Sequence, residues 1–188
     1  VILDTSPAKA SVAAWVRELL PSRCHYVGIS LRLNPKFALE QNETISAASA
    51  DLFEHGEMAI AAPPGTASQA IDLAADLAGL LGTRPFFCDL AEMDGLTAST
   101  RLLPQLVSSA LLNATLGQPG WRDALKFTGA DYAAASSGIA GREESASLRE
   151  AALLNRENLL RSLDDTLSAL QALRADIEND LGDALEKK

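Results

Sequence analysis

The sequence has 188 residues, 47% of them hydrophobic and 22% charged, and this composition excludes the disordered and fibrous classes. The formal net charge of −9 offers no basic face to phosphate groups, so we expect neither nucleic acids nor anionic membranes as partners. No apolar run approaches the roughly 20 residues that a membrane span requires.

The first residues indicate a junction between a strand and a helix. Residues 1–3 are apolar, residues 4–6 form turns readily, and Pro7 fits the first turn of a helix, where its missing N–H costs nothing. A buried strand needs neighbours on both sides. We therefore expect the natural protein to have further residues before this strand.

Up to about residue 89 the chain alternates short apolar runs with helical segments. The apolar runs predict strands at 1–3, 26–30, 58–62 and 85–88. Between them, apolar residues at helical spacing predict helices at 8–20 and 66–81. Thr66 and Gln69 have the spacing of a capping box, and Gly82 stands where a glycine ends a helix. This alternation predicts the end of a parallel, Rossmann-type sheet.

After residue 89 the hydrophobic period is helical. Residues 102–114 predict an apolar helix in which Pro104 marks either a kink or the start. Residues 147–177 predict one long helix, opened by Ser147 and Glu150, whose leucine stripe requires a partner helix. The fold class is therefore α/β followed by all-α, with one domain over residues 1–89 and a helical domain over residues 90–188.

Two cysteines, Cys24 and Cys88, lie in separate strand-like segments. Neither has a neighbour at the spacing of a metal site, and two thiols do not make a disulfide framework in a chain of this length. We expect two buried apolar thiols in a cytoplasmic protein, and no metal.

Six stretches of the chain resemble, in the same order, those of the prephenate and arogenate dehydrogenase family. They are "DTSPAKA", "HYVGISLRLNP", "DLFEHGEMAIAAPPGT", "LLGTRPFFCDLAEMDGLTA", "RLLPQLVSSALL" and "LLNRENLLRSLDDTLSALQALR". The resemblance covers essentially the whole chain. It implies a dinucleotide-binding domain followed by a helical dimerisation domain like the C-terminal domain of 6-phosphogluconate dehydrogenase. It also implies an NAD- or NADP-dependent oxidative decarboxylation in tyrosine biosynthesis.

The family's phosphate-binding glycines are not found in this sequence. No G-x-G-x-x-G occurs anywhere in it, and Gly79 and Gly82 end a helix instead of opening one. Through the resemblance, the turn at "SPAK" corresponds to a cofactor-side loop and makes Ser6 and Lys9 candidate cofactor-binding residues. Alternatively, Ser6 caps the helix and Lys9 is an ordinary first-turn residue in solvent.

The resemblance also places the family's catalytic histidines on residues that cannot replace them. Ile29 and Leu102 occupy two of these positions, and neither side chain accepts a proton. Lys126 lies in the stretch where the family has an arginine for the substrate carboxylate, but it lacks the planar guanidinium fork. Arg101 is a further candidate for an anionic substrate group, with a rim salt bridge as its alternative.

Two functions remain open from the sequence. One is a prephenate dehydrogenase-like oxidoreductase that uses NAD or NADP on a small-molecule substrate. The other is a non-catalytic dimeric scaffold or ligand-binding protein that keeps the fold, because this chain differs from the family at the positions of the site residues. In both cases the apolar helices predict a homodimer.

Overall fold

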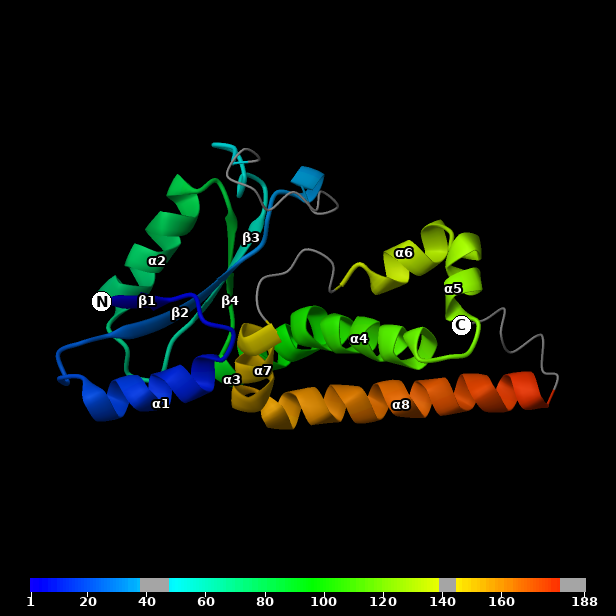
Figure 1. Ribbon diagram of the computed structural model, residues 1–188. Coiled ribbons are helices and arrows are strands. Elements are labelled where there is room, and N and C mark those ends of the chain that lie inside the picture. Colours follow the sequence, from blue (N-terminus) through cyan, green and yellow to red (C-terminus); the bar gives the residue numbers. More distant parts are fainter. Residues whose placement is uncertain (38–47, 139–144, 180–188) are drawn as a thin grey trace.

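A computed structural model describes residues 1–37, 48–138 and 145–179. The first part of the chain forms strands and helices in alternation, and the second part is helical (Figure 1). The first part comprises β1 (Ile2–Asp4), α1 (Lys9–Leu19), β2 (Tyr26–Leu31), η1 (Pro35–Phe37), β3 (Glu57–Ala61), α2 (Ser68–Leu80) and β4 (Arg84–Phe87). The second comprises α3 (Leu90–Thr97), η3 (Ala98–Leu102), α4 (Leu103–Leu116), α5 (Trp121–Ala124), η4 (Leu125–Phe127), α6 (Ala130–Ser136), α7 (Ser145–Leu154) and α8 (Arg156–Glu178). The predicted fold class is confirmed.

The four predicted strands form one sheet in the order β1-β2-β3-β4. β1 pairs with β2 and β3 with β4 in parallel, but β2 and β3 are antiparallel, with Gly28 opposite Ala61. The prediction of a wholly parallel sheet is therefore wrong for the central pair. A parallel pairing needs a crossover over the sheet face, and the described part of the β2–β3 connection contains only the short turn η1.

The sheet is covered on both faces (Figure 1). Helix α2 lies on one face, where its alanines 70, 74 and 78 pack against apolar side chains of β2 and β3. Alanine at every fourth position gives α2 a flat stripe that approaches the sheet closely. Helices α1 and α3 contact each other and lie on the opposite face.

Helix α2 ends as predicted but begins differently. Gly82 has a φ of +68° and follows the last turn, as a glycine terminator should. The predicted capping box is wrong: the residue before the helix is Ala67, which has no capping side chain, and the Thr66 hydroxyl donates to the Pro63 carbonyl. The double proline of the preceding loop sets this turn before the helix can start.

The predicted long helix at 147–177 is broken. Helix α7 ends at Leu154 and α8 starts at Arg156, with Asn155 between them at φ −111° and ψ 33°. The Asn155 amide is buried and donates to the Asp94 carbonyl at 2.7 Å. This distant hydrogen bond explains the break, which the leucine spacing does not show.

Pro104 lies in the first turn of helix α4, where a proline is tolerated. Of its two predicted roles, the start of the helix is therefore confirmed and the kink is not. The residues before it, Ala98–Leu102, form a π-helical segment between α3 and α4. Helices α4 and α8 then run side by side, away from the sheet (Figure 1). Over the described residues, no helix is both long enough and apolar enough to cross a membrane.

Candidate functional site

A buried lysine lies where β1 passes into α1. Lys9 is 1% exposed, and its ammonium group donates to the Asp4 carbonyl at 2.6 Å and lies 3.3 Å from the Asp4 carboxylate. The hydroxyls of Ser6 and Tyr26 both donate to the same carboxylate oxygen at 2.8 Å. Asp4 therefore balances the buried charge and collects the polar groups around it.

Asp94 of α3 joins this cluster from 85 residues further along the chain. Its two carboxylate oxygens accept the backbone N–H groups of Lys9 at 2.6 Å and Ala10 at 2.9 Å. These are among the first N–H groups of α1, which have no partner inside the helix. Asp94 thus caps α1, while its carbonyl holds Asn155, so one residue connects the sheet end of the chain to α8.

The Lys9 side chain lies over Gly28 of β2. A Cβ atom at position 28 would come within 2.8 Å of Lys9 Cδ. A larger residue at this place in the strand would displace the lysine stem and with it the contact to Asp4. Gly28 is needed here for close approach and not for an unusual backbone angle.

Burial and hydrogen bonding oppose each other in the cluster. Burial raises the pKa of Asp4, but the hydrogen bonds from Ser6 and Tyr26 and the charge of Lys9 outweigh it, and the net pKa lies below its ordinary value. Burial lowers the pKa of Lys9, with partial compensation by Asp4. Burial, followed by its contact with Asp4, raises the pKa of Tyr26, which therefore stays protonated.

The structure brings Ser6 and Lys9 together, and the pKa of Lys9, lowered first by burial, is lowered further by the charge of Arg101. The Ser6 hydroxyl donates its proton to Asp4, so its oxygen can still accept a hydrogen bond, whereas the Lys9 ammonium is enclosed. Arg101 is exposed in η3. Lys126 lies on the surface and pairs with Asp123 at 2.7 Å.

The two residues at the family's histidine positions lie in apolar clusters. Ile29 is 3% exposed and packs on the α2 face of the sheet. Leu102 is 2% exposed and packs with Ala151 and Leu159. Ser30 follows Ile29 in the strand, so its side chain points to the opposite face, toward α3.

A cavity of about 440 Å³ lies between the end of β2 and the junction of α3 with η3. No sequence motif marks Arg32 or Thr100, which lie on its wall, as functional residues. A signal was present, because ligands of such sheets bind beyond the carboxyl ends of strands and Arg32 directly follows β2. The lining residues are Ser30, Arg32, Glu57, Ala59, Phe86, Met93, Leu96, Thr97 and Thr100.

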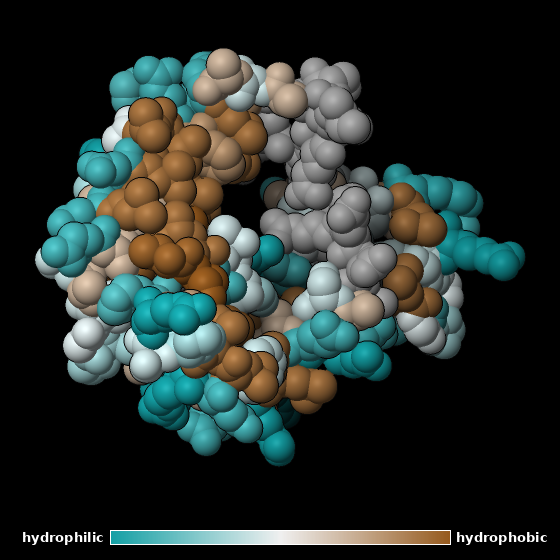
Figure 2. Space-filling model, turned by 90° about the vertical axis from the view of Figure 1, so that its left-hand side faces the viewer, coloured by the Kyte–Doolittle hydropathy of each residue, from teal (hydrophilic) through white to brown (hydrophobic). Residues whose placement is uncertain are grey.

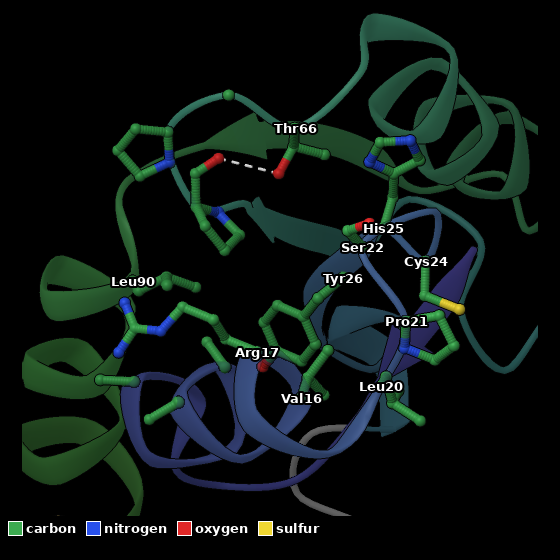
Figure 3. A pocket seen from close by; sticks show the side chains of 16 residues that line it. Val16, Arg17, Leu20, Pro21, Ser22, Cys24, His25, Tyr26, Thr66 and Leu90 are labelled. Atoms are coloured by element: carbon green, nitrogen blue, oxygen red, sulfur yellow. Dashed lines mark hydrogen bonds between the residues drawn. The ribbon is translucent and has the colours of Figure 1, made fainter.

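A second cavity, of about 650 Å³, lies at the opposite edge of the sheet, between α1, the start of β2 and the loop before α2 (Figure 3). Val16, Leu20, Pro21 and Leu90 give it a largely apolar wall, with Arg17 at one end and His25 at the other. The Tyr26 and Thr66 hydroxyls already donate within the protein. Its polar groups are thus occupied or placed at the rim.

Neither cavity has the ligands of a metal site. The described residues contain no group of three or more His, Cys, Asp or Glu side chains that could hold a metal ion. Cys24 and Cys88 are free and only partly buried, which corrects the expectation of two buried thiols.

Comparison with known proteins gives matches by structure only. No protein-family model matches the chain, and no curated protein sequence matches it. Arogenate dehydrogenase of Synechocystis matches 100% of this chain at 21% identity, with a TM-score of 0.80. Prephenate dehydrogenase of A. aeolicus, in complex with hydroxyphenyl propionate and NAD+, matches 100% of it at 16% identity, with a TM-score of 0.82.

The chain has the fold of the arogenate and prephenate dehydrogenases. A further Aquifex aeolicus prephenate dehydrogenase structure agrees, at 14% identity and a TM-score of 0.75. The chain spans 65% of the Synechocystis protein and 63% of the two Aquifex chains. The resemblance noted in the sequence is thereby confirmed at the level of the fold.

The residues of this chain do not build a complete dinucleotide site of the dehydrogenase kind. The sequence contains no G-x-G-x-x-G, and the described residues that surround Asp4 use their polar groups on one another. At the turn after β1, the partly exposed Ser6 and the exposed Thr5 beside it carry hydroxyl oxygens that a ligand could contact.

Proposed function

We propose that this chain is part of an NAD- or NADP-dependent oxidoreductase of the prephenate or arogenate dehydrogenase type. The observation that carries the proposal is the cavity beyond the end of β2, enclosed by the α3–η3 junction in a fold shared with those enzymes. Its size suits a small organic molecule, and its position is that of substrates in open α/β sheets.

In this proposal the chain supplies the substrate side of the site. Residues 1–89 form the end of the dinucleotide-binding domain, and residues 90–188 form the helical domain that closes the cavity. Ser6 would contact the cofactor beside β1, and Arg101 would act on an anionic substrate group from the helical part. The cofactor, when bound, supplies the hydride acceptor. Glu57 is the carboxylate on the cavity wall, and it pairs with Arg84.

One observation favours a second candidate function. Ile29 and Leu102, at the family's histidine positions, are buried in apolar clusters and take no part in proton transfer. A protein that has lost these groups while keeping its packing could serve as a dimeric scaffold or a ligand-binding protein in the cytoplasm.

The natural full-length protein distinguishes the two functions. Calorimetric titration with NAD, then NADP, then prephenate or arogenate in the presence of the cofactor that binds, should show two binding events. The absorbance of the reduced nicotinamide should then report turnover. If neither cofactor binds up to about a millimolar, a generous ceiling for enzyme affinities, the oxidoreductase proposal fails and the scaffold remains.

A further inference from the structure

The cavity beyond β2 contains a cation that has no carboxylate partner among the described residues. Arg32 lines the cavity, and its guanidinium makes one side-chain hydrogen bond there, from Nη2 to Thr100 Oγ1 at 2.9 Å. The guanidinium carries several further N–H donors in a planar fork. Those donors remain for a ligand.

One hydrogen bond holds the Arg32 backbone and another orients its guanidinium. The Arg32 backbone N–H donates to the Glu57 carbonyl at 2.8 Å, which extends the β2–β3 pairing by one residue. The Thr100 hydroxyl donates to the Leu96 carbonyl at 2.7 Å, so its proton is committed and its oxygen faces the arginine. Thr100 belongs to the π-helical segment, an irregularity frequent at functional sites.

The charges around the cavity favour an anion. Glu57 also lines it, but its carboxylate pairs with Arg84 at 2.6 Å across the β3–β4 pair. The charge of Glu57 is therefore neutralised by Arg84, and that of Arg32 is left uncompensated. In a chain of net charge −9 this makes the cavity a local positive site.

Much of the remaining wall is apolar, with the hydroxyl-bearing Ser30 and Thr97 as its other members. Ala59, Phe86, Met93 and Leu96 line the cavity beside Arg32, and Met93 is 1% exposed. Such a wall suits a ring or another compact apolar body, while the planar fork suits a carboxylate in bidentate contact.

We propose that Arg32 is the carboxylate-binding residue of this cavity, that Thr100 positions it, and that the ligand is a small monocarboxylate with an apolar or ring-bearing body. The proposal rests on the proposed function only in taking this cavity as the substrate site. Arg32 thus does the work for which the family resemblance offered Lys126, a lysine that already pairs with Asp123.

The test compares a carboxylate with its neutral amide in the full-length protein. The probes are hydroxyphenyl propionate and hydroxyphenyl propionamide, titrated by calorimetry with and without NAD. Wild type should bind the acid at least about tenfold more tightly than the amide, since a charge-assisted pair is stronger than a neutral hydrogen bond. Arg32→Gln should weaken acid binding by about ten- to a hundredfold and leave amide binding within about threefold.

Three further variants complete the design. Arg23→Gln removes the same charge before β2, at the other edge of the sheet, and should leave both affinities unchanged. Arg32→Lys should restore part of the preference for the acid, because it restores the charge without the fork. Thr100→Val should reduce the acid-to-amide ratio, which a purely structural role of Thr100 would leave intact.

The outcomes separate this proposal from the proposed function. An unchanged acid-to-amide ratio in Arg32→Gln, no preference for the acid in wild type, or binding of neither probe up to about a millimolar would overturn the role of Arg32. An Arg32-dependent preference for the acid without any cofactor binding or turnover would support this role and overturn the oxidoreductase instead.

Discussion

At the scale of single residues, the cluster around Asp4 shows how a charge is kept inside this protein. Lys9 is buried, yet its ammonium finds both the carbonyl and the carboxylate of Asp4, and Gly28 leaves room for its stem. Removing one partner from a buried pair leaves the other charge uncompensated, which costs far more than losing a surface pair. The two kinds of pair in this chain permit a direct comparison.

Asp4→Asn should lower the free energy of unfolding by about 3 kcal/mol, because it leaves the Lys9 charge buried without its counter-ion. Urea unfolding at neutral pH measures this loss. The matched control is Asp123→Asn, which breaks the exposed pair with Lys126 and should cost less than about 1 kcal/mol. Equal losses in the two variants would show that the Asp4 pair is not stabilised by burial.

The pKa of Asp4 gives this pair a pH dependence. The folded pKa lies below the ordinary value of 3.8, so the ionised carboxylate stabilises the fold above that pH. The contribution is lost as the pH falls through the lower folded pKa. The difference in unfolding free energy between wild type and Asp4→Asn should therefore shrink on acidification from about pH 5 to about pH 2, which urea unfolding at each pH would measure. A constant difference would contradict the assignment.

At the scale of elements, helix α2 combines two glycines with opposite requirements. Gly79 lies inside the helix, and an added Cβ would meet no atom within 4 Å. Gly82 follows the helix with a φ of +68°, and an added Cβ would meet Glu54 Cγ at 3.2 Å. The first glycine only weakens the helix, whereas the second terminates it.

Gly79→Ala should raise the free energy of unfolding by about 0.5–1 kcal/mol through helix propensity, and Gly82→Ala should lower it by about 1–2 kcal/mol through strain at positive φ. Thermal unfolding of the two variants beside wild type measures both changes. A stabilising Gly82→Ala would show that the loop relaxes at no cost.

Two features of the helices and strands do not follow from local sequence patterns. The periodicity of leucines predicted one helix from residue 147 to residue 177, and the break at Asn155 depends on the carbonyl of Asp94, 61 residues away. In the same way, strand composition predicted four strands but not that the central pair runs antiparallel. These choices are made by contacts between distant segments.

At the scale of the whole molecule, apolar side chains remain at the surface in several places, of which two stand out. One is the face that carries β1 and the C-terminal end of α1, where Figure 2 shows a continuous apolar band and where Val1, Trp15 and Leu19 are exposed. The other is α8, where Leu160, Leu167 and Leu170 are about half exposed. Exposed patches of this kind are typical of interaction surfaces.

The proposed homodimer uses the leucine stripe of α8. The natural protein should sediment as a dimer at micromolar concentration, and Leu167→Lys should shift it toward the monomer by at least about tenfold in dissociation constant, since a charge would enter an apolar interface. Leu73→Lys on α2, where the leucine is similarly exposed, is the control and should leave the dimer intact. A monomeric wild type would contradict the proposal.

Local sequence patterns suffice for the four strands, for helices α1, α2 and α4 and for the fold class, because hydrophobic period, turn residues and a helix-ending glycine act over a few neighbouring residues. The sequence also indicated the resemblance to the prephenate and arogenate dehydrogenase family, and the comparison of structures agrees with it at the level of the fold. The tertiary structure alone decided the mixed pairing of the sheet, the capping of α1 by Asp94 and the break before α8. It alone placed Arg32 and Thr100 on one cavity. Each of these joins residues far apart in the chain, and no local pattern records which distant group a buried polar atom will find.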